Sequence, residues 1–257
     1  MGTAEIARDC EELAGGWMCF GGDGSWANQA CGLGLSGPVS EADIDRLIAF
    51  YTSRNTEPQI EVSPFADETL IAELARRGFQ LREFENVLAR ELKPKENLQA
   101  LHPHSLPDGL TIAHVDPSNA AQVESFASAS TQGFRTEGTR ISEVDALMTE
   151  KIVRHPRCDA FLANIDGTDV GGGAMAARGE LACLFSASVA ADHQRRGVHA
   201  ALMIRRLERA RERGCSVAVI HSTPEATTER NARRLGFALA YTRVIMTMPG
   251  LGLKPSP

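Results

Sequence analysis

The sequence contains no long apolar run and no recognisable export signal. No stretch of about 18 consecutive apolar residues occurs in its 257 residues, so no membrane-spanning helix is expected. Glu5, Asp9, Glu11 and Glu12 stand near the start, where a signal peptide needs a basic segment and an apolar core. We therefore expect a cytoplasmic protein without a membrane partner.

Cysteine is scarce and scattered. The six cysteines form no CxxC pair and show none of the close His/Cys spacings of zinc sites. A disulfide framework would also be denser in a chain of this length. The sequence therefore predicts reduced thiols and no metal site.

Positive charge is in the minority, with a formal net charge of −6. This balance argues against general nucleic-acid binding. Seven arginines nevertheless gather in the twenty residues 194–213. The five after Gly197 are predicted to form a solvated helix face interrupted by acids; they are Arg205, Arg206, Arg209, Arg211 and Arg213. Met203, Leu207 and Ala210 are predicted to form the buried stripe opposite them.

Two halves of the chain end in a similar way. Gly78-Phe79 and Gly236-Phe237 each follow a predicted helix and precede a predicted strand. The glycine would end the helix in a left-handed cap. A segment rich in proline and charge separates the halves, which predicts an N-terminal domain at 1–95, a linker at 96–109 and a second domain at 110–257.

The second half has the clearer order of elements. Short turns joining residues 158–166, 169–179 and 180–191 predict an antiparallel meander. The glycines at 171–173 are interpreted as a bulged or closely approached strand, since no helix follows them. The predicted order is strand 110–116, helices 117–130 and 141–154, the meander, helix 198–213, strand 215–222, helix 224–235 and a final strand.

A basic, glycine-containing turn joins the meander to the long helix. The first N–H groups of a helix lack intrahelical acceptors and attract anions. Gly197 would let a ligand approach the backbone, and Arg195 and Arg196 add charge suited to phosphate. Neither GxxxxGK[ST] nor GxGxxG is present, so a different phosphate-containing cofactor is expected.

The stretch HQRRGVHAAL, residues 193–202, resembles motif A of the GNAT superfamily of N-acetyltransferases, written Q/R-x-x-G-x-G/A. Gln194 and Gly197 match the motif, whereas His199 stands where a second small residue is usual. The order of elements over residues 110–248 is also similar to the family's. The resemblance implies an α/β (α+β) fold of two GNAT-like units, each a mixed, mostly antiparallel twisted sheet flanked by helices, with a splayed strand pair in the C-terminal unit. The N-terminal half lacks the motif and is expected to be a degenerate unit.

The resemblance also implies how acetyl-CoA would bind. Strand backbone would hold the pantetheine arm, the amides of the turn would hold the pyrophosphate, and a side chain of the next helix would assist or merely cap a local turn. These cofactor-binding candidates are Ala187, Ser188, Val189, Gln194, Arg195, Arg196, Gly197, Val198, His199, Ala200 and Asn231.

Catalytic residues are harder to assign. Ala232 occupies the place where many family members carry a tyrosine that protonates the departing thiolate, and Tyr241 on the next strand is an alternative. Glu137 and Glu180 are candidate general bases. An amine that is already neutral in the site would need no base.

The expected function is transfer of an acetyl group from acetyl-CoA to a primary amine of a small molecule or peptide, by direct transfer in a ternary complex. The alternatives are a CoA-binding module with weak chemistry and an enzyme for longer acyl-CoAs. The sequence leaves the oligomeric state open between monomer and homodimer.

Overall fold

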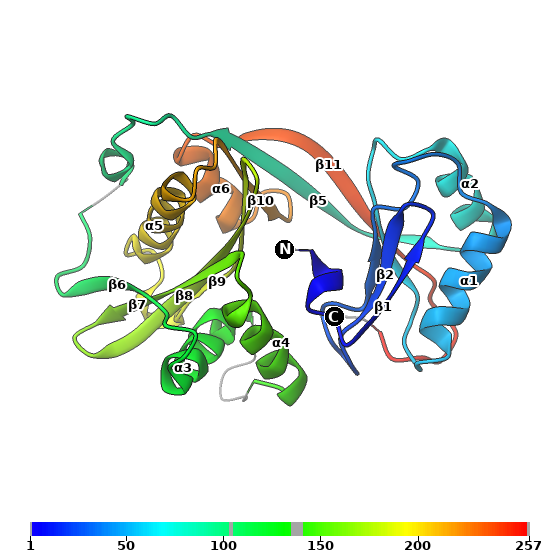
Figure 1. The fold of residues 1–257 in the computed structure, drawn as a ribbon, viewed down its shortest axis with the longest axis horizontal. Coiled ribbons are helices and arrows are strands. Elements are labelled where there is room, and N and C mark those ends of the chain that lie inside the picture. The colour runs from blue at the N-terminus through cyan, green and yellow to red at the C-terminus, as the bar shows by residue number, and fades with distance from the viewer. Residues whose placement is uncertain (1, 103–104, 135–140, 256–257) are drawn as a thin grey trace. The chain divides into compact units, whose positions relative to one another are not determined.

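The computed structural model describes residues 2–102, 105–134 and 141–255, and the chain forms two compact units (Figure 1). Unit 1 comprises residues 87–240. Unit 2 comprises residues 2–86 together with the segment from Tyr241 onward. Each unit has its own hydrophobic core.

Unit 1 follows the predicted order of elements. Its strands are β6 (Leu110–His114), β7 (Cys158–Ile165), β8 (Thr168–Arg178), β9 (Leu181–Val189) and β10 (Val217–Ser222), with the end of β5 (Gln80–Glu91). Its α-helices are α3 (Ala120–Thr131), α4 (Glu143–Arg154), α5 (Val198–Glu212) and α6 (Thr227–Arg234). Short 3-10 helices are η2 (Leu98–Leu101), η3 (Gln132–Phe134) and η4 (Ala191–His193). Strands β6 to β9 pair antiparallel in sequence, which confirms the predicted meander.

Helices cover both faces of the unit 1 sheet, with α5 on one side and α3 and α4 on the other (Figure 1). The three glycines of β8 permit this packing. A Cβ at Gly172 would lie 3.2 Å from Phe126 and Ser130 of α3, whereas one at Gly173 would lie 3.0 Å from Arg206 of α5. Successive residues of a strand point to opposite faces, so these two glycines admit one helix on each side.

Strands β9 and β10 form a fork. They pair in parallel from Leu181 opposite Val217 to Leu184 opposite Ile220, while β9 continues to Val189. Beyond Leu184, the edge of β9 that faces β10 therefore pairs with no strand among the described residues. The register of β9 with β8 also shifts between Gly172 and Ala174, which marks a β-bulge.

Unit 2 is smaller and has two α-helices among its described residues. Its strands are β1 (Asp9–Leu13), β2 (Gly16–Phe20), β3 (Gln29–Cys31), β4 (Gln59–Val62), the start of β5 and the end of β11 (Ala238–Thr247). A short η1 (Thr3–Glu5) precedes them, and the helices are α1 (Glu41–Thr52) and α2 (Glu68–Arg76). Ser40 caps α1 by accepting a hydrogen bond from Asp43 N.

Two long strands, β5 and β11, each contribute residues to both units. Over the described residues, hydrogen bonding joins the strands in the order β1-β2-β3-β4-β11-β5-β10-β9-β8-β7-β6, a mixed sheet of 11 strands rather than two separate sheets. Strand β5 begins in unit 2 and ends in unit 1, and β11 runs the other way. The expected linker at 96–109 contains η2, whose Leu98 is buried in the core of unit 1. The sequence pattern did not reveal this exchange because each strand looks continuous along the chain.

Among the described residues, no helix is long and apolar enough to cross a membrane.

Candidate functional site

The basic turn before α5 adopts an unusual backbone conformation. Gly197 is the N-cap of α5 and has φ +83° and ψ −8°, a left-handed conformation that favours glycine. A Cβ there would meet only Leu106 Cδ2, at 3.5 Å, so the backbone is nearly bare on that side. Arg195 is also left-handed, with φ +60°. The turn thus presents main-chain groups rather than side chains at the start of the helix.

The α-helices differ in how their first turns are capped. Side chains of Ser40, Asp67, Asn119 and Ser142 accept hydrogen bonds at the starts of α1 to α4. Neither α5 nor α6 has a side-chain cap. The free N–H groups and the positive end of the helix dipole are therefore available to an anion at both helices.

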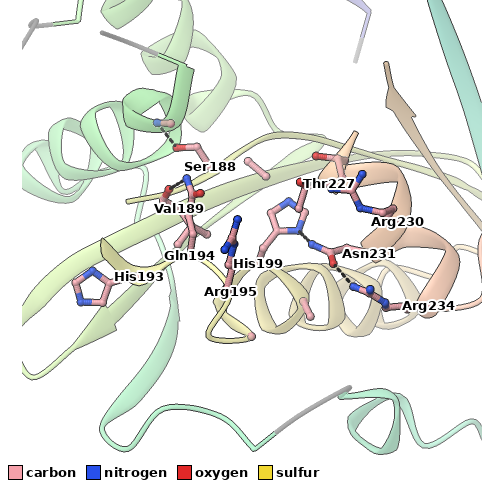
Figure 2. A pocket seen from close by; sticks show the side chains of 15 residues that line it. Ser188, Val189, His193, Gln194, Arg195, His199, Thr227, Arg230, Asn231 and Arg234 are labelled. Atoms are coloured by element: carbon pink, nitrogen blue, oxygen red, sulfur yellow. Dashed lines mark hydrogen bonds between the residues drawn. The ribbon is translucent and has the colours of Figure 1, made fainter. Parts of the chain in front are cut away.

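A cavity of about 560 Å³ lies where these two helix starts meet the end of β9 (Figure 2). Residues from η3, β9, the basic turn, α5 and α6 contribute to its wall. They are Gly133, Ala187, Ser188, Val189, His193, Gln194, Arg195, Gly197, His199, Ala200, Thr227, Thr228, Arg230, Asn231 and Arg234.

The cavity wall carries positive charge without acidic compensation. Arg195, Arg230 and Arg234 line it, and no aspartate or glutamate does so among the residues that the structure describes. Together with the two uncapped helix starts, these guanidinium groups favour a polyanionic ligand.

His199 lies on the cavity wall and is neutral. Burial lowers its pKa, with a smaller contribution from the positive charge of Arg206, to about 4. The Asn231 amide nitrogen lies 3.2 Å from His199 Nδ1, and Arg234 Nη1 donates to Asn231 Oδ1 at 3.3 Å. This chain of contacts, visible in Figure 2, makes Nδ1 the acceptor and leaves the hydrogen on Nε2. His199 thus offers a neutral donor.

Hydrogen bonds fix the end of β9 beside the turn. Gln194 Nε2 donates to the Val189 carbonyl at 3.2 Å. Ser188 Oγ donates to the Ala129 carbonyl at 2.8 Å and accepts from Gly133 N at 3.1 Å. These contacts tie the strand to the basic turn on one side and to α3 and η3 on the other.

Most of the predicted cofactor-binding residues line this single cavity. Arg196 and Val198 do not line it; the side chain of Val198 is buried in the core, and Arg196 is exposed. Six further residues of the cavity wall were not predicted from the sequence; they are Gly133, His193, Thr227, Thr228, Arg230 and Arg234. Thr227 and Thr228 begin α6, so the absence of a capping residue before them was the available signal.

Of the predicted catalytic residues that the structure describes, Glu180 and Tyr241, neither lines the cavity. Glu180 precedes β9 at the end opposite Ala187, and seven residues of strand span about 23 Å. Tyr241 belongs to unit 2, where its ring packs edge-on against Phe65 with centroids 5.2 Å apart. Glu137 lies outside the described residues. Ala232 is buried in the core of unit 1.

One prediction about α5 is wrong. Arg206 is fully buried rather than part of a solvated face. Met203, Leu207 and Ala210 form the buried stripe as predicted. Arg209 and Arg213 bind the buried carboxylate of Asp159. Within the described part of the chain, no cluster of His, Cys, Asp or Glu side chains could hold a metal ion.

The chain is similar in fold to solved structures. A GCN5-related N-acetyltransferase from Kribbella flavida has 19% identity and a TM-score of 0.70, covering 96% of this chain and 92% of its own. A conserved protein of unknown function from Staphylococcus epidermidis has 12% identity and a TM-score of 0.61, with 98% of both chains covered. A tandem GNAT protein from the clavulanic acid biosynthesis pathway has 14% identity and a TM-score of 0.56, covering 77% of this chain and 66% of its own.

No curated protein sequence matches the chain. Residues 121–237, which include the fork, the basic turn and both uncapped helix starts, match the model of the acetyltransferase (GNAT) family. That match identifies residues 121–237 of this chain as similar to the GNAT family of acetyltransferases.

Proposed function

We propose that this protein is an acetyl-CoA-dependent N-acetyltransferase that moves an acetyl group to a primary amine of a small molecule or peptide. The observation that carries the proposal is the cavity where two uncapped helix starts meet guanidinium groups and no carboxylate among the described residues. The match of residues 121–237 to the GNAT family supports the choice of acetyl-CoA as the donor.

The donor set suits the diphosphate of coenzyme A. The bare backbone at Gly197 admits phosphate oxygens, and the amides of the first turn of α5 can donate to them. Arg195 from the turn and Arg230 and Arg234 from α6 add formal charge from other directions. His199 contributes its neutral Nε2–H without adding charge.

The fork suits the pantetheine arm. Past Leu184, β9 has no β10 partner, so the main-chain groups on that edge are free to bond an extended amide chain as another strand would. Ala187, Ser188 and Val189 lie on this part of β9 and also line the cavity. The proposed path therefore runs from the helix starts along β9 toward the fork.

Acetyl-CoA supplies an acetyl group already activated as a thioester. The chain holds this group at the fork and offers main-chain N–H groups to the carbonyl oxygen, where negative charge develops during attack. No acid among the described residues lines the cavity, so an amine that enters in its neutral form is the proposed nucleophile. Direct transfer within a ternary complex follows, because no thiol lines the cavity to carry the acetyl group among those residues.

A second function is a CoA-binding module with weak chemistry, which the lack of a cavity-lining tyrosine or carboxylate among the described residues favours. Calorimetry with acetyl-CoA and CoA tests binding. Release of free thiol from acetyl-, succinyl- and longer acyl-CoAs, with a panel of primary amines, tests transfer. Binding with amine-dependent thiol release supports the proposed function. Binding without it supports the module, and no binding refutes both.

A further inference from the structure

Arg206, in the middle of α5, is the largest fully buried side chain among the described residues. Its guanidinium makes three hydrogen bonds, all to main-chain carbonyls. Nε donates to Leu202 O at 3.0 Å, and Nη1 donates to Ala174 O at 3.2 Å and to Phe185 O at 3.3 Å. Nη2 is buried without a hydrogen-bond partner in the described structure. The group therefore carries a positive charge, and none of the described carboxylates forms an ion pair with it.

The sheet is shaped around this guanidinium. A Cβ at Gly173 would lie 3.0 Å from Arg206 Cζ, so the glycine lets the guanidinium pack closely against the strand. On the partner strand, the ladder passes from Ser188 opposite Gly172 to Phe185 opposite Ala174, and Ser186 takes a left-handed φ of +46°. Arg206 thus packs against the β-bulge from the side of α5 and donates to the carbonyls of Ala174 and Phe185, the pair next to the register shift.

The other arginines of α5 are only half-buried. Arg205 and Arg209 bind the carboxylates of Glu212 and Asp159, and Arg211 donates to the main-chain carbonyls of Lys93 and Glu96. Burial without an acidic partner is costly for a guanidinium and lowers the pKa of Arg206 to about 9. A methionine or leucine would fill the same core space at no such cost. Core packing therefore does not explain why this position carries an arginine, whereas a need for positive charge at the site does.

The guanidinium lies at the fork. Phe185, whose carbonyl it binds, is the first residue of β9 past the last pair with β10. The vacant Cβ position of Gly173 is 3.4 Å from the Cβ of Ala187, which lines the cavity, so Arg206 and Ala187 meet at the same glycine. His199, two helical turns earlier on the same side of α5, also lines the cavity.

We propose that Arg206 is a positioning residue for acyl transfer, which holds the β9 bulge in place and sets an uncompensated positive charge beneath the fork. The proposal rests on the proposed function, since it takes the fork as the place of the thioester. An amine nitrogen attacks the carbonyl carbon, the C–S bond breaks with its electron pair on sulfur, and the nitrogen gives up one proton as the thiolate gains one. Negative charge passes from the carbonyl oxygen to sulfur, and a fixed nearby cation stabilises both. Ala232 cannot protonate the departing thiolate. The positive charge of Arg206 would compensate in part by stabilising that thiolate.

The titratable groups that interact electrostatically with Arg206 are few. The thiol of Cys183 on β9 acts to raise the pKa of the arginine, and Arg206 in turn helps to keep His199 neutral. His199, which is neutral, does not cancel the charge of the guanidinium.

Three variants test the proposal: Arg206→Met removes the charge and the hydrogen bonds, Arg206→Gln keeps a donor without the charge, and Arg206→Lys keeps the charge. Arg209→Met on the same helix is the matched control, since Arg209 binds Asp159 away from the cavity. Three readouts are compared: calorimetric affinity for acetyl-CoA, thiol release with the amine panel, and the pH midpoint of thiolate absorbance for bound CoA. The last needs no acceptor, and a merely structural role would not move it.

Arg206→Met and Arg206→Gln should keep the affinity for acetyl-CoA within about threefold while kcat falls by about tenfold or more. The bound thiol should ionise at higher pH than in the wild type, Arg206→Lys should restore part of both effects, and Arg209→Met should alter neither. If Arg206→Met does not fold, the Gln and Lys variants carry the comparison. Unchanged kcat and thiol midpoint in charge-free variants that bind acetyl-CoA would overturn the Arg206 proposal alone. A wild-type protein that does not bind acetyl-CoA would overturn the proposed function and this inference with it.

Discussion

Substitution at Gly197 tests the cavity most directly, because it separates backbone strain from ligand repulsion. Gly197→Ala adds a methyl group at a left-handed position, and Gly197→Glu adds a carboxylate as well. Gly214 is the matched control, since it follows the other end of α5 with φ +81°, and a Cβ added there would meet no atom within 4 Å. Gly214→Glu therefore adds the same side chain and similar strain, away from the cavity.

The expected magnitudes differ between strain and charge. A left-handed conformation costs a non-glycine residue about 1–2 kcal/mol, so all three variants should lose about that much free energy of unfolding. Sterics add little at Gly197, because Leu106 Cδ2 is 3.5 Å away. A glutamate carboxylate about 6 Å from one phosphate charge repels it by about 3 kcal/mol at an effective dielectric constant of about 20, which corresponds to about a hundredfold in Kd.

Isothermal titration calorimetry with CoA, alongside chemical denaturation of each variant, gives both quantities. Gly197→Glu should lose CoA binding by about a hundredfold or more. Gly197→Ala should lose much less, and Gly214→Glu should bind as the wild type does. Wild-type affinity in a folded Gly197→Glu variant would show that the diphosphate does not lie on this turn, and the proposed cofactor site would be refuted.

Three further predictions concern stability. Burial keeps His199 neutral in the folded protein down to about pH 4, so between pH 6.5 and pH 4 only the unfolded state takes up its proton. As the pH falls through this range, the wild type should therefore lose about 1 kcal/mol of unfolding free energy per pH unit relative to His199→Gln, measured by denaturation at several pH values. Asp159→Asn should lower the free energy of unfolding at neutral pH by about 3 kcal/mol. Burial opposes ionisation of Asp159, but hydrogen bonds from Arg213 and Arg209 lower its pKa below 3.8. The difference in unfolding free energy between wild type and Asp159→Asn should therefore shrink as the pH falls through 3.8 and below. A difference that stays constant with pH would refute the role of the Asp159 carboxylate as an ion-pair partner. Ser188→Ala removes the bonds to Gly133 and Ala129 and should cost about 1–3 kcal/mol, with faster hydrogen exchange at Gly133 N; unchanged exchange would show that the tether is not formed in solution.

Local sequence patterns predicted much of unit 1. Helix caps, the meander and the glycine turn are set by residues close together along the chain, so they could be recognised without the fold. The buried stripe of Met203, Leu207 and Ala210 is an example. The GNAT resemblance extended these patterns to an order of elements, which the family match supports.

Features that depend on distant residues could not be predicted in this way. Arg206 is buried because Gly173, 33 positions earlier on another element, leaves space for its guanidinium. From the sequence of α5 alone, Arg206 would be assigned to the same solvated face as the other charged residues of the helix. Likewise, Arg230 and Arg234 line the cavity only because α6 starts beside α5, which helical periodicity cannot show.

The exchange of strands between the units bears on biosynthesis. Unit 1 is one continuous stretch, residues 87–240, whereas β11, which pairs with β4 through Val244 opposite Val62, supplies unit 2 with a central strand from later in the chain. On a translating ribosome, the segment with the cavity can therefore complete its core before the earlier-made residues 2–86 receive their last strand. Until then, β4 exposes an unpaired edge on the nascent chain, and any chaperone dependence of this protein should be concentrated in that interval.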